Sequence, residues 1–453
     1  MAPEEAASST VLDPARVRGI EREALDTGDA GREAAAGALF IPRNLVKLVF
    51  LASGVTASLM RDEQVVPRVE ELLSPKPGSF SVLPSLFLDT RRRASAGAQV
   101  LGNLGFAAVR LAGGFGGIHD GVGEARVGFA LPRPLPFVLS FEGLIDTRST
   151  LDYYGVGQEP GTDPRNLFLR KAATTDGVYF EERIRGLVTL GARIGQDFEW
   201  FVSSSILRSL VEDTPGGGPG TITSVFQPGS VAGAPSLSAA GCGVTAAPTV
   251  FRTALPTTSC PASSLITYTE LAVRLDTRAS KSRPSPGVLV GAYGGVAAGV
   301  GDDPSRFYRL GAQAAGFISV RRTTNILSPK LILDGTVRPA GAAPVPFTQL
   351  VGQPEFRGID SRIDALALVA SLDYRWSMIR YLGPRIFLDM AQVGPSMGAL
   401  LKAPPRFATG FGFDFFSNST ELGQAMMSFS SEGVRVLFTF GVPTQFGDRQ
   451  HRR

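Results

Sequence analysis

The chain has 453 residues, a length that would usually divide into several soluble domains, and a single large β-barrel is the main exception. Glycine is abundant (53 residues), charged side chains are few (19%), and the formal net charge of +4 gives no indication of nucleic acid binding. The sequence contains no apolar run of about 20 residues, which excludes a helical membrane protein.

The N-terminal part of the chain differs in character from the rest. Residues 1–30 are rich in Ala, Glu, Ser and Asp without an apolar period, which predicts a disordered lead, and residues 31–78 predict a short helical segment. The stretch Leu48–Met60 is apolar and follows Arg43 and Lys47, as the core of an export signal would. Its distance from the first residue favours a buried or interfacial helix instead, so no export signal is evident.

After Pro77 the sequence changes to segments of about ten residues in which large apolar side chains alternate with small or polar ones. In the first segment, Phe80 and Val82 alternate with Ser79 and Ser81. Clear repeats of this pattern occur at residues 124–131, 137–146, 270–276, 406–415 and 434–441. A period of two residues predicts strands with one apolar face, and about 16 such segments lie between residues 79 and 443.

The polar face of these strands carries Gly, Ala, Ser and isolated charges of both signs, unlike a sheet face exposed to water. Small residues suit the interior of a closed barrel, and an outer face of Phe, Leu and Val suits lipid. A soluble β-sandwich is the alternative, but so many strands would leave long exposed edges. The predicted fold class is therefore all-β: a transmembrane antiparallel barrel of about 16 strands over residues 79–446, followed by a basic tail at 447–453.

The longest segment without strand alternation covers residues 213–263 and predicts a polar extracellular loop. Both cysteines of the chain, Cys242 and Cys260, lie in it. Their isolation in a polar stretch favours a disulfide bond formed in an oxidising compartment over two free thiols. Neither cysteine has the His and Asp neighbours of a metal site, so we expect no metal and no cofactor.

Several short motifs fall on the predicted strands and loops in a defined order. They are Tyr154-Gly155-Val156-Gly157, then Asp276-Thr277-Arg278 with Gly287, then Phe356-Arg357-Gly358-Ile359, then Asp373-Tyr374-Arg375, then Phe387-Leu388-Asp389, and a last strand from Ser431 to Phe446. In this order they resemble the BamA/TamA surface-antigen superfamily of outer-membrane β-barrels, over residues 79–446 and a shorter lead. The sequence departs from the family at Ile359, where an aromatic residue is usual, and at Ala391, where glycine is expected.

The resemblance implies that residues 338–363 form a loop that folds into the barrel lumen and carries Arg357 near its tip. The period of two independently places Asp373 and Asp389 on the lumen face, where two carboxylates need a cation. Arg357 could supply its planar guanidinium with five donors, and we favour this pairing. The alternative is that each carboxylate meets a different lumen arginine or water.

Two further expectations concern particular side chains. The resemblance implies a hairpin that involves Asp276, Arg278 and Gly287. The parity that points Asp373 inward assigns Tyr374 and Trp376 to the lipid-facing side of the same strand.

The resemblance implies a protein of the insertase or translocase class in the outer membrane of Gram-negative bacteria, acting in protein or lipid assembly without covalent chemistry. Expected partners are outer-membrane lipids and lipopolysaccharide, with client proteins or periplasmic proteins as further candidates, and no nucleic acid. The segment at 31–78, which would then be periplasmic, lacks the strand alternation of the family's polypeptide-binding repeats, so we expect no such repeat. A passive pore or structural barrel is therefore the alternative function.

An enzyme is not expected. An acyl hydrolase would need a Ser/His pair at the membrane interface, and the chain has only two histidines. His119 lies in a glycine-rich turn and His451 lies in the basic tail, which are poor positions for a catalytic base.

Overall fold

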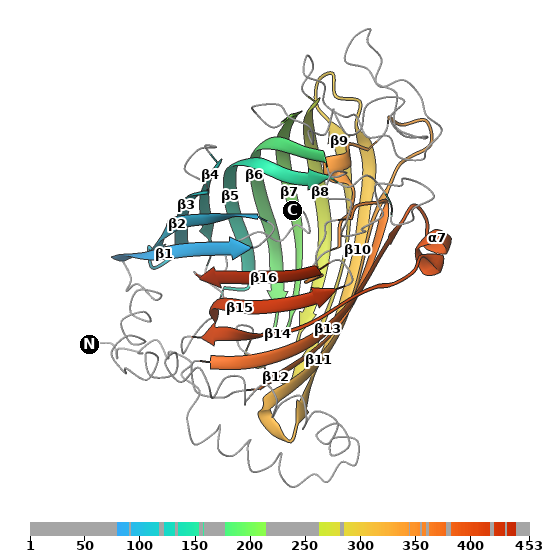
Figure 1. Cartoon of the computed structure of the whole chain (residues 1–453). Helices are drawn as coiled ribbons and strands as arrows, with labels where there is room; N and C mark the ends of the chain where they lie inside the picture. Colours follow the sequence, from blue (N-terminus) through green and yellow to red (C-terminus); the bar gives the residue numbers. More distant parts are fainter. Residues whose placement is uncertain are drawn as a thin grey trace, which may run out of the picture.

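The computed structural model is a single closed barrel of 16 antiparallel strands (Figure 1). Each strand pairs with its neighbours in the sequence, and the first strand closes the barrel against the last. The structure describes residues 79–89, 92–116, 122–131, 135–153, 157, 177–213, 262–280, 285–343, 345–353, 356–358, 362–376, 382–416, 421–430 and 433–440.

The first eight strands run from the N-terminal side of the seam to the middle of the barrel. They are β1 (Ser79–Asp89), β2 (Arg92–Asn103), β3 (Ala108–Gly116), β4 (Val122–Ala130), β5 (Phe137–Tyr153), β6 (Gly177–Ile194), β7 (Phe198–Asp213) and β8 (Ala262–Asp276). The remaining strands return to the seam. They are β9 (Gly287–Gly299), β10 (Arg306–Val320), β11 (Arg322–Val337), β12 (Leu366–Trp376), β13 (Leu382–Gly394), β14 (Arg406–Phe416), β15 (Glu421–Ser430) and β16 (Gly433–Phe440).

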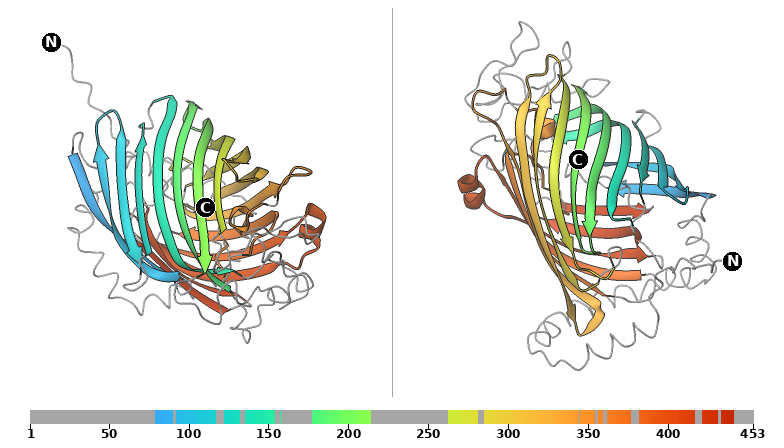
Figure 2. Two further views of the ribbon diagram at one scale, coloured as in Figure 1. Left: turned by 90° about the horizontal axis from the view of Figure 1, so that it is seen from above. Right: turned by 180° about the vertical axis from the view of Figure 1, so that it is seen from behind.

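The wall of the barrel is much taller on one side than on the other. Strands β6, β7, β10 and β11 have 15 to 18 residues, whereas β15 has 10 and β16 has 8. Figure 2 shows the long strands forming the wall opposite the short strands that meet at the seam. The seam therefore lies on the shorter side of the wall, where β1 to β4 and β14 to β16 have 8 to 12 residues each.

Alternate side chains of each strand point to opposite sides of the wall, as the period of two predicts. On β7, Trp200, Val202 and Ile206 are exposed on the outer face, whereas Ser203 and Ser205 are buried on the lumen face. An outer face that is apolar and a lumen face that is small and polar are the pattern of a barrel surrounded by lipid.

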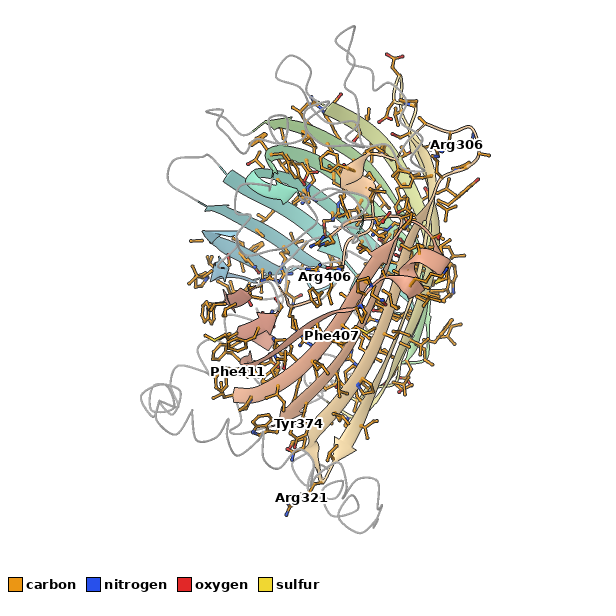
Figure 3. The ribbon with its side chains drawn as sticks, turned by 45° about the vertical axis from the view of Figure 1, so that its right-hand side comes forward. Arg306, Arg321, Tyr374, Arg406, Phe407 and Phe411 are labelled. Atoms are coloured by element: carbon orange, nitrogen blue, oxygen red, sulfur yellow. The ribbon has the colours of Figure 1, made fainter. Side chains whose placement is uncertain are left out.

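Arginines bracket the apolar outer face of β10. Arg306 and Arg321 are exposed at opposite ends of the tall wall (Figure 3), and Tyr308, Leu310 and Ile318 are exposed between them. Arg321 adopts a left-handed backbone conformation (φ 63°) in the tight turn between β10 and β11. Long arginine side chains at the two ends of an apolar strand suit the polar boundaries of a bilayer.

The side chains of Tyr374 and Trp376 differ from the prediction. Both have the outward parity of β12, but they are only 4% and 2% exposed, so the expected contact with lipid is wrong. Their rings stack with centroids 5.4 Å apart and pack with Val320, against Leu327 and Ile386 of neighbouring strands. Large aromatic rings near a strand end bury each other, which parity alone does not foresee.

The closed antiparallel barrel of 16 strands expected from the sequence is confirmed. The lead over residues 1–78, the tail at 447–453 and both Cys242 and Cys260 lie outside the described residues, so the helical segment and the disulfide stay predictions. Within the described ranges, no helix is both long and apolar enough to cross a membrane.

Candidate functional site: a loop docked in the lumen

The connection between β11 and β12 covers residues 338–365 and packs against lumen-facing side chains of the barrel wall. It contains a short 3-10 helix, η2 (Phe347–Gln349), and an isolated antiparallel bridge between Val351 and Asp364. We call this segment the lumen loop.

Backbone hydrogen bonds hold the base of the lumen loop. The bridge residues exchange both bonds, from Val351 N–H to the Asp364 carbonyl and back, each at 3.0 Å. Beside them, Thr336 N–H donates to the Ala365 carbonyl at 2.7 Å. Gly157 N–H donates to the carbonyl of Ile363 at 2.9 Å, which ties the glycine of the Tyr154–Gly157 motif to the loop. Tyr154 and Gly155 of that motif lie outside the described residues.

The first half of the lumen loop docks through an apolar cluster. Val345, Phe347 and Leu350 are buried there against side chains of the tall wall: Val211, Ile266, Tyr268, Ala297 and Phe307. The ring of Phe347 meets Tyr179 of β6 edge to face, with centroids 5.3 Å apart. Burial of this apolar surface is the main force that keeps the first half of the loop inside the barrel.

The tip of the lumen loop brings Arg357 between Asp373 of β12 and Asp389 of β13. Its Nη1 donates to Asp373 Oδ1 at 2.5 Å, its Nε donates to Asp389 Oδ2 at 2.8 Å, and its Nη2 donates to Asp389 Oδ1. The Arg357 backbone N–H also donates to Asp389 Oδ2 at 3.0 Å. The guanidinium lies 3.7 Å above the ring of Phe387, and the side chain of Asp389 is fully buried. One arginine thus donates to two inward carboxylates and offsets part of their charge, because its fork of donors reaches both.

The two residues that flank Arg357 in the sequence, Phe356 and Gly358, allow the loop tip to pack closely against the barrel wall. Phe356 is buried in a second apolar cluster with lumen-facing residues of β11 to β14, namely Ile332, Val369, Ala391 and Ala408. A Cβ at Gly358 would lie 2.5 Å from the Phe356 ring and 3.0 Å from the Cβ of Ala408. Glycine at this position therefore allows the close approach of the tip to β14.

The tip also contacts the last two strands through its backbone carbonyls. Ser428 Oγ of β15 donates to the carbonyl of Arg357 at 2.6 Å. Arg435 Nη1 of β16 donates to the carbonyl of Gly358 at 3.3 Å. Neither residue was predicted as part of the site, although both are polar side chains with lumen parity in otherwise apolar strands.

The hairpin between β8 and β9 brings Asp276, Arg278 and Gly287 together. Arg278 Nε and Nη2 donate to the buried carboxylate of Asp276 at 2.8 and 2.9 Å. Gly287 has φ +148°, and a Cβ there would lie 2.9 Å from the backbone of Arg278. The Arg278 guanidinium lies 4.6 Å from the ring centroid of Phe317 on β10. The three residues therefore lie together at the base of this hairpin.

Other lumen charges pair with one another along the wall. Arg185 Nη2 lies 2.9 Å from Glu142 Oε1, and Arg309 Nη2 lies 2.7 Å from Asp334 Oδ2. Between β13 and β14, Arg385 Nη1 lies 3.2 Å from Asp414 Oδ1. Charged residues at lumen parity in otherwise apolar strands are the sequence signal that could have identified these pairs. In the part of the chain that the structure describes, no group of three or more His, Cys, Asp or Glu could hold a metal ion.

Comparison with known proteins defines the class of fold. No protein-family model and no curated protein sequence matches the chain. Among solved structures, it is similar to BamA from Haemophilus ducreyi lacking POTRA domains 1–3, with a TM-score of 0.54 and 13% identity over 81% of this chain and 70% of that chain. The chain therefore has the fold of the BamA barrel, as its motifs indicated.

Two further solved structures are more distant. They are CdiB from Acinetobacter baumannii (TM-score 0.46, 9% identity over 80% of this chain) and CdiB from Escherichia coli (TM-score 0.49, 9% identity over 81% of this chain). The matches span 60% and 64% of the two CdiB chains.

Proposed function

We propose that this protein spans the outer membrane of Gram-negative bacteria and assists the assembly or passage of proteins or lipids, through its seam and lumen loop and without covalent chemistry. The observation that carries the proposal is a lumen loop whose tip contacts β15 and β16, beside a seam that has four registered pairs among the described residues.

The apolar side chains on the outer face of the barrel support the proposal that the barrel spans a membrane. Exposed Val, Leu, Ile and Phe side chains cover this face from Phe80 on β1 to Val436 on β16. Such a surface would be unfavourable in water, whereas lipid accepts it and closure of the barrel satisfies the backbone. We expect outer-membrane lipids and lipopolysaccharide to be its immediate partners.

The strand order also suggests an orientation. The connections after β7 and β11 leave the same end of the barrel, because antiparallel strands alternate in direction. The long segment at 214–261 is one of them and the lumen loop is the other. Long loops of outer-membrane barrels face the cell exterior, so we infer that the lumen loop enters from the outside.

Among the described residues, the seam has the fewest registered strand pairs in the wall. Within the described residues, β1 pairs with β16 at four positions, from Leu86↔Phe440 to Asp89↔Leu437, whereas β6 and β7 pair over 16. A strand pair with fewer ladder hydrogen bonds separates at a lower free-energy cost. We therefore expect β1 and β16 to separate more easily than neighbouring strands that pair over more positions. A client strand could then add to the exposed edges by β-augmentation.

A passive pore is the second candidate. The docked lumen loop supports the assembly function over it, because a segment anchored on both the tall wall and β12 to β16 obstructs the lumen. Conductance in a planar bilayer separates the two: a large stable conductance would favour the pore.

A disulfide across the seam tests the proposed function directly. In a Cys242→Ser/Cys260→Ser background, Leu86→Cys with Phe440→Cys places cysteines on registered positions of β1 and β16. The matched control, Val202→Cys with Leu271→Cys, links registered outward positions of β7 and β8. The readout is folding of an unfolded eight-stranded outer-membrane barrel added to liposomes that contain the protein, followed by the client's heat-modifiable gel band.

We expect the oxidised seam variant to lose its acceleration of client folding and to regain it on reduction, because the client needs a free strand edge. The oxidised control should remain active. Equal activity of the two oxidised variants would contradict a function through the seam, and no acceleration by the unlinked protein would leave the passive pore as the better account.

A further inference from the structure

Polar side chains gather on the outer face of the tall wall, near the end of the barrel from which the lumen loop starts. Two rows of outward-facing residues cross β7 to β10 there, and the members of each row are registered with one another. The row nearer the end consists of Ile206, Thr267, Ala298 and Arg306, and the next row consists of Ser204, Thr269, Val296 and Tyr308. Arg208 has the outward position beyond Ile206 on β7. We call the two rows together with Arg208 the polar rim.

The hydroxyl groups of the polar rim mark a boundary on the outer face. The side-chain oxygens of Ser204 and Thr269 share a hydrogen bond at 3.0 Å, and Thr267 Oγ1 donates to the Ala298 carbonyl at 3.1 Å. The following row toward the middle of the wall carries no polar side chain and consists of Val202, Leu271, Gly294 and Leu310. The face thus changes from polar to apolar within one row, as expected where lipid headgroups meet the hydrocarbon of a bilayer.

The length of the apolar face on β10 agrees with this boundary. The outward residues from Tyr308 to Ile318 carry no charge and span roughly 33 Å along the strand. At a strand tilt of about 40°, this length corresponds to a height of roughly 25 Å, which is the height of the apolar band of an outer-membrane barrel. Arg306 and Arg321, which Figure 3 labels at the two ends of the wall, therefore lie at the two boundaries of the membrane.

Arg208 and Arg306 are the cations of the polar rim. Both side chains are exposed, and neither forms a hydrogen bond or an ion pair with another residue in the part of the chain that the structure describes. Glu182 of β6 also has outward parity and, through its register with Leu210, lies diagonally beside Arg208, but no ion pair joins the two. Asp302 is exposed in the turn before β10 and does not pair with Arg306. Both guanidinium groups therefore have their donors available for an external anion.

We propose that the polar rim binds the phosphorylated sugar headgroup of lipopolysaccharide, with Arg208 and Arg306 each contacting one phosphate. The two arginines lie on β7 and β10, three strand spacings or roughly 14 Å apart across the sheet. A sugar headgroup with a phosphate at each end offers two anions to arginines on different strands, whereas phosphatidylglycerol carries a single phosphate. The fork of guanidinium donors matches phosphate oxygens, and the rim hydroxyls face the region that sugar hydroxyls would occupy.

The proposal rests on the outer-membrane position proposed above and gives the expected lipid partner a site on the barrel. It does not rest on the assembly activity. Figure 2 shows the tall wall opposite the short strands of the seam, so a lipid bound at the polar rim leaves the seam accessible to a client.

Titration of the whole protein in detergent with diphosphoryl lipid A, followed by native mass spectrometry, tests the site. Arg208→Ala and Arg306→Ala should each raise the apparent dissociation constant about fivefold, the effect of one arginine near an anionic lipid, and the double change should raise it roughly 25-fold. The lysine variants of both positions should retain part of the affinity, because lysine keeps the charge without the fork. The matched control is Arg321→Ala, which removes an exposed arginine from the other end of β10 and should leave the affinity unchanged.

The number of phosphates on the lipid tests the choice of partner. Wild type should bind monophosphoryl lipid A and phosphatidylglycerol more weakly than diphosphoryl lipid A, because each of them offers one phosphate. Equal affinity of wild type for diphosphoryl lipid A and phosphatidylglycerol would overturn the assignment to lipopolysaccharide. Equal weakening by Arg306→Ala and Arg321→Ala would overturn the site. All of these substitutions are at exposed positions, so the folded gel band should disappear at the wild-type temperature in each variant.

The binding result does not depend on any client. A barrel that binds diphosphoryl lipid A through Arg208 and Arg306 but does not accelerate client folding would keep the site and refute the assembly function. Unchanged lipid binding in the double variant, together with accelerated client folding, would refute the site and keep the assembly function.

Discussion

Replacing Arg357 with glutamate is expected to cause the largest loss of barrel stability among substitutions in the lumen loop. The change removes the cation between Asp373 and Asp389 and adds a third negative charge in a confined, largely buried space. Removing one partner of a buried ion pair costs about 3–5 kcal/mol, and charge reversal should exceed the effect of Arg357→Ala. The measurement is the temperature at which the folded band disappears in unboiled gel electrophoresis.

Two controls make this result specific. Arg306→Glu reverses the charge of an exposed arginine at the end of β10 and should leave the transition nearly unchanged. The double change Arg357→Ala with Asp389→Ala should recover part of the loss, because neither side remains unpaired. If Arg357→Glu melts like wild type, the tip does not dock on β12 and β13.

The second large effect is expected for Phe347→Ala. Phe347 is 3% exposed, belongs to the apolar cluster on the tall wall and meets Tyr179 edge to face. Truncating a buried phenylalanine costs about 3–5 kcal/mol, through the lost transfer energy and the cavity that remains. We expect a lower melting temperature of the folded band and faster proteolysis within residues 338–365.

The matched control for Phe347 is Phe407→Ala on β14. Phe407 is 52% exposed on the outer face, so its truncation creates no internal cavity and should change the melting temperature little. Equal effects of the two substitutions would show that Phe347 is not part of a packed lumen core.

The barrel could be predicted because each strand repeats the same local rule. Phe80 and Val82 face outward and Ser81 faces inward, as their parity predicts, and the same rule points Asp373 and Asp389 into the lumen. Parity is a property of neighbouring residues in one strand, so a sequence expresses it directly.

Contacts between distant segments could not be predicted in the same way. The alternation at residues 434–441 placed Arg435 on the lumen face, but it could not say that a loop about 70 residues earlier would offer two carbonyls to Arg435 and Ser428. Backbone acceptors have no sequence signature, because every residue carries one.

The prediction that Tyr374 and Trp376 contact lipid was wrong for a related reason. Their parity was correct, but their packing depends on Val320, which lies on β10 and approaches them only when β10, β11 and β12 have paired. A rule that reads one strand at a time gives the direction of a side chain and not the neighbours that cover it.

The central claim is that the lumen loop docks inside a closed barrel, and a disulfide between Gly358→Cys and Ala408→Cys tests it most directly. A Cβ added at Gly358 would lie 3.0 Å from the Cβ of Ala408, so the two must move apart by roughly half an ångström to reach the separation of a disulfide, and the end of the Phe356 side chain must move aside. In a Cys242→Ser/Cys260→Ser background, oxidation of the folded protein should produce this crosslink efficiently. Gly358→Cys with Phe407→Cys should not crosslink, because Phe407 is the sequence neighbour of Ala408 but faces outward. Failure of the Ala408 pair to crosslink, or equal crosslinking of the two pairs, would contradict the docked loop.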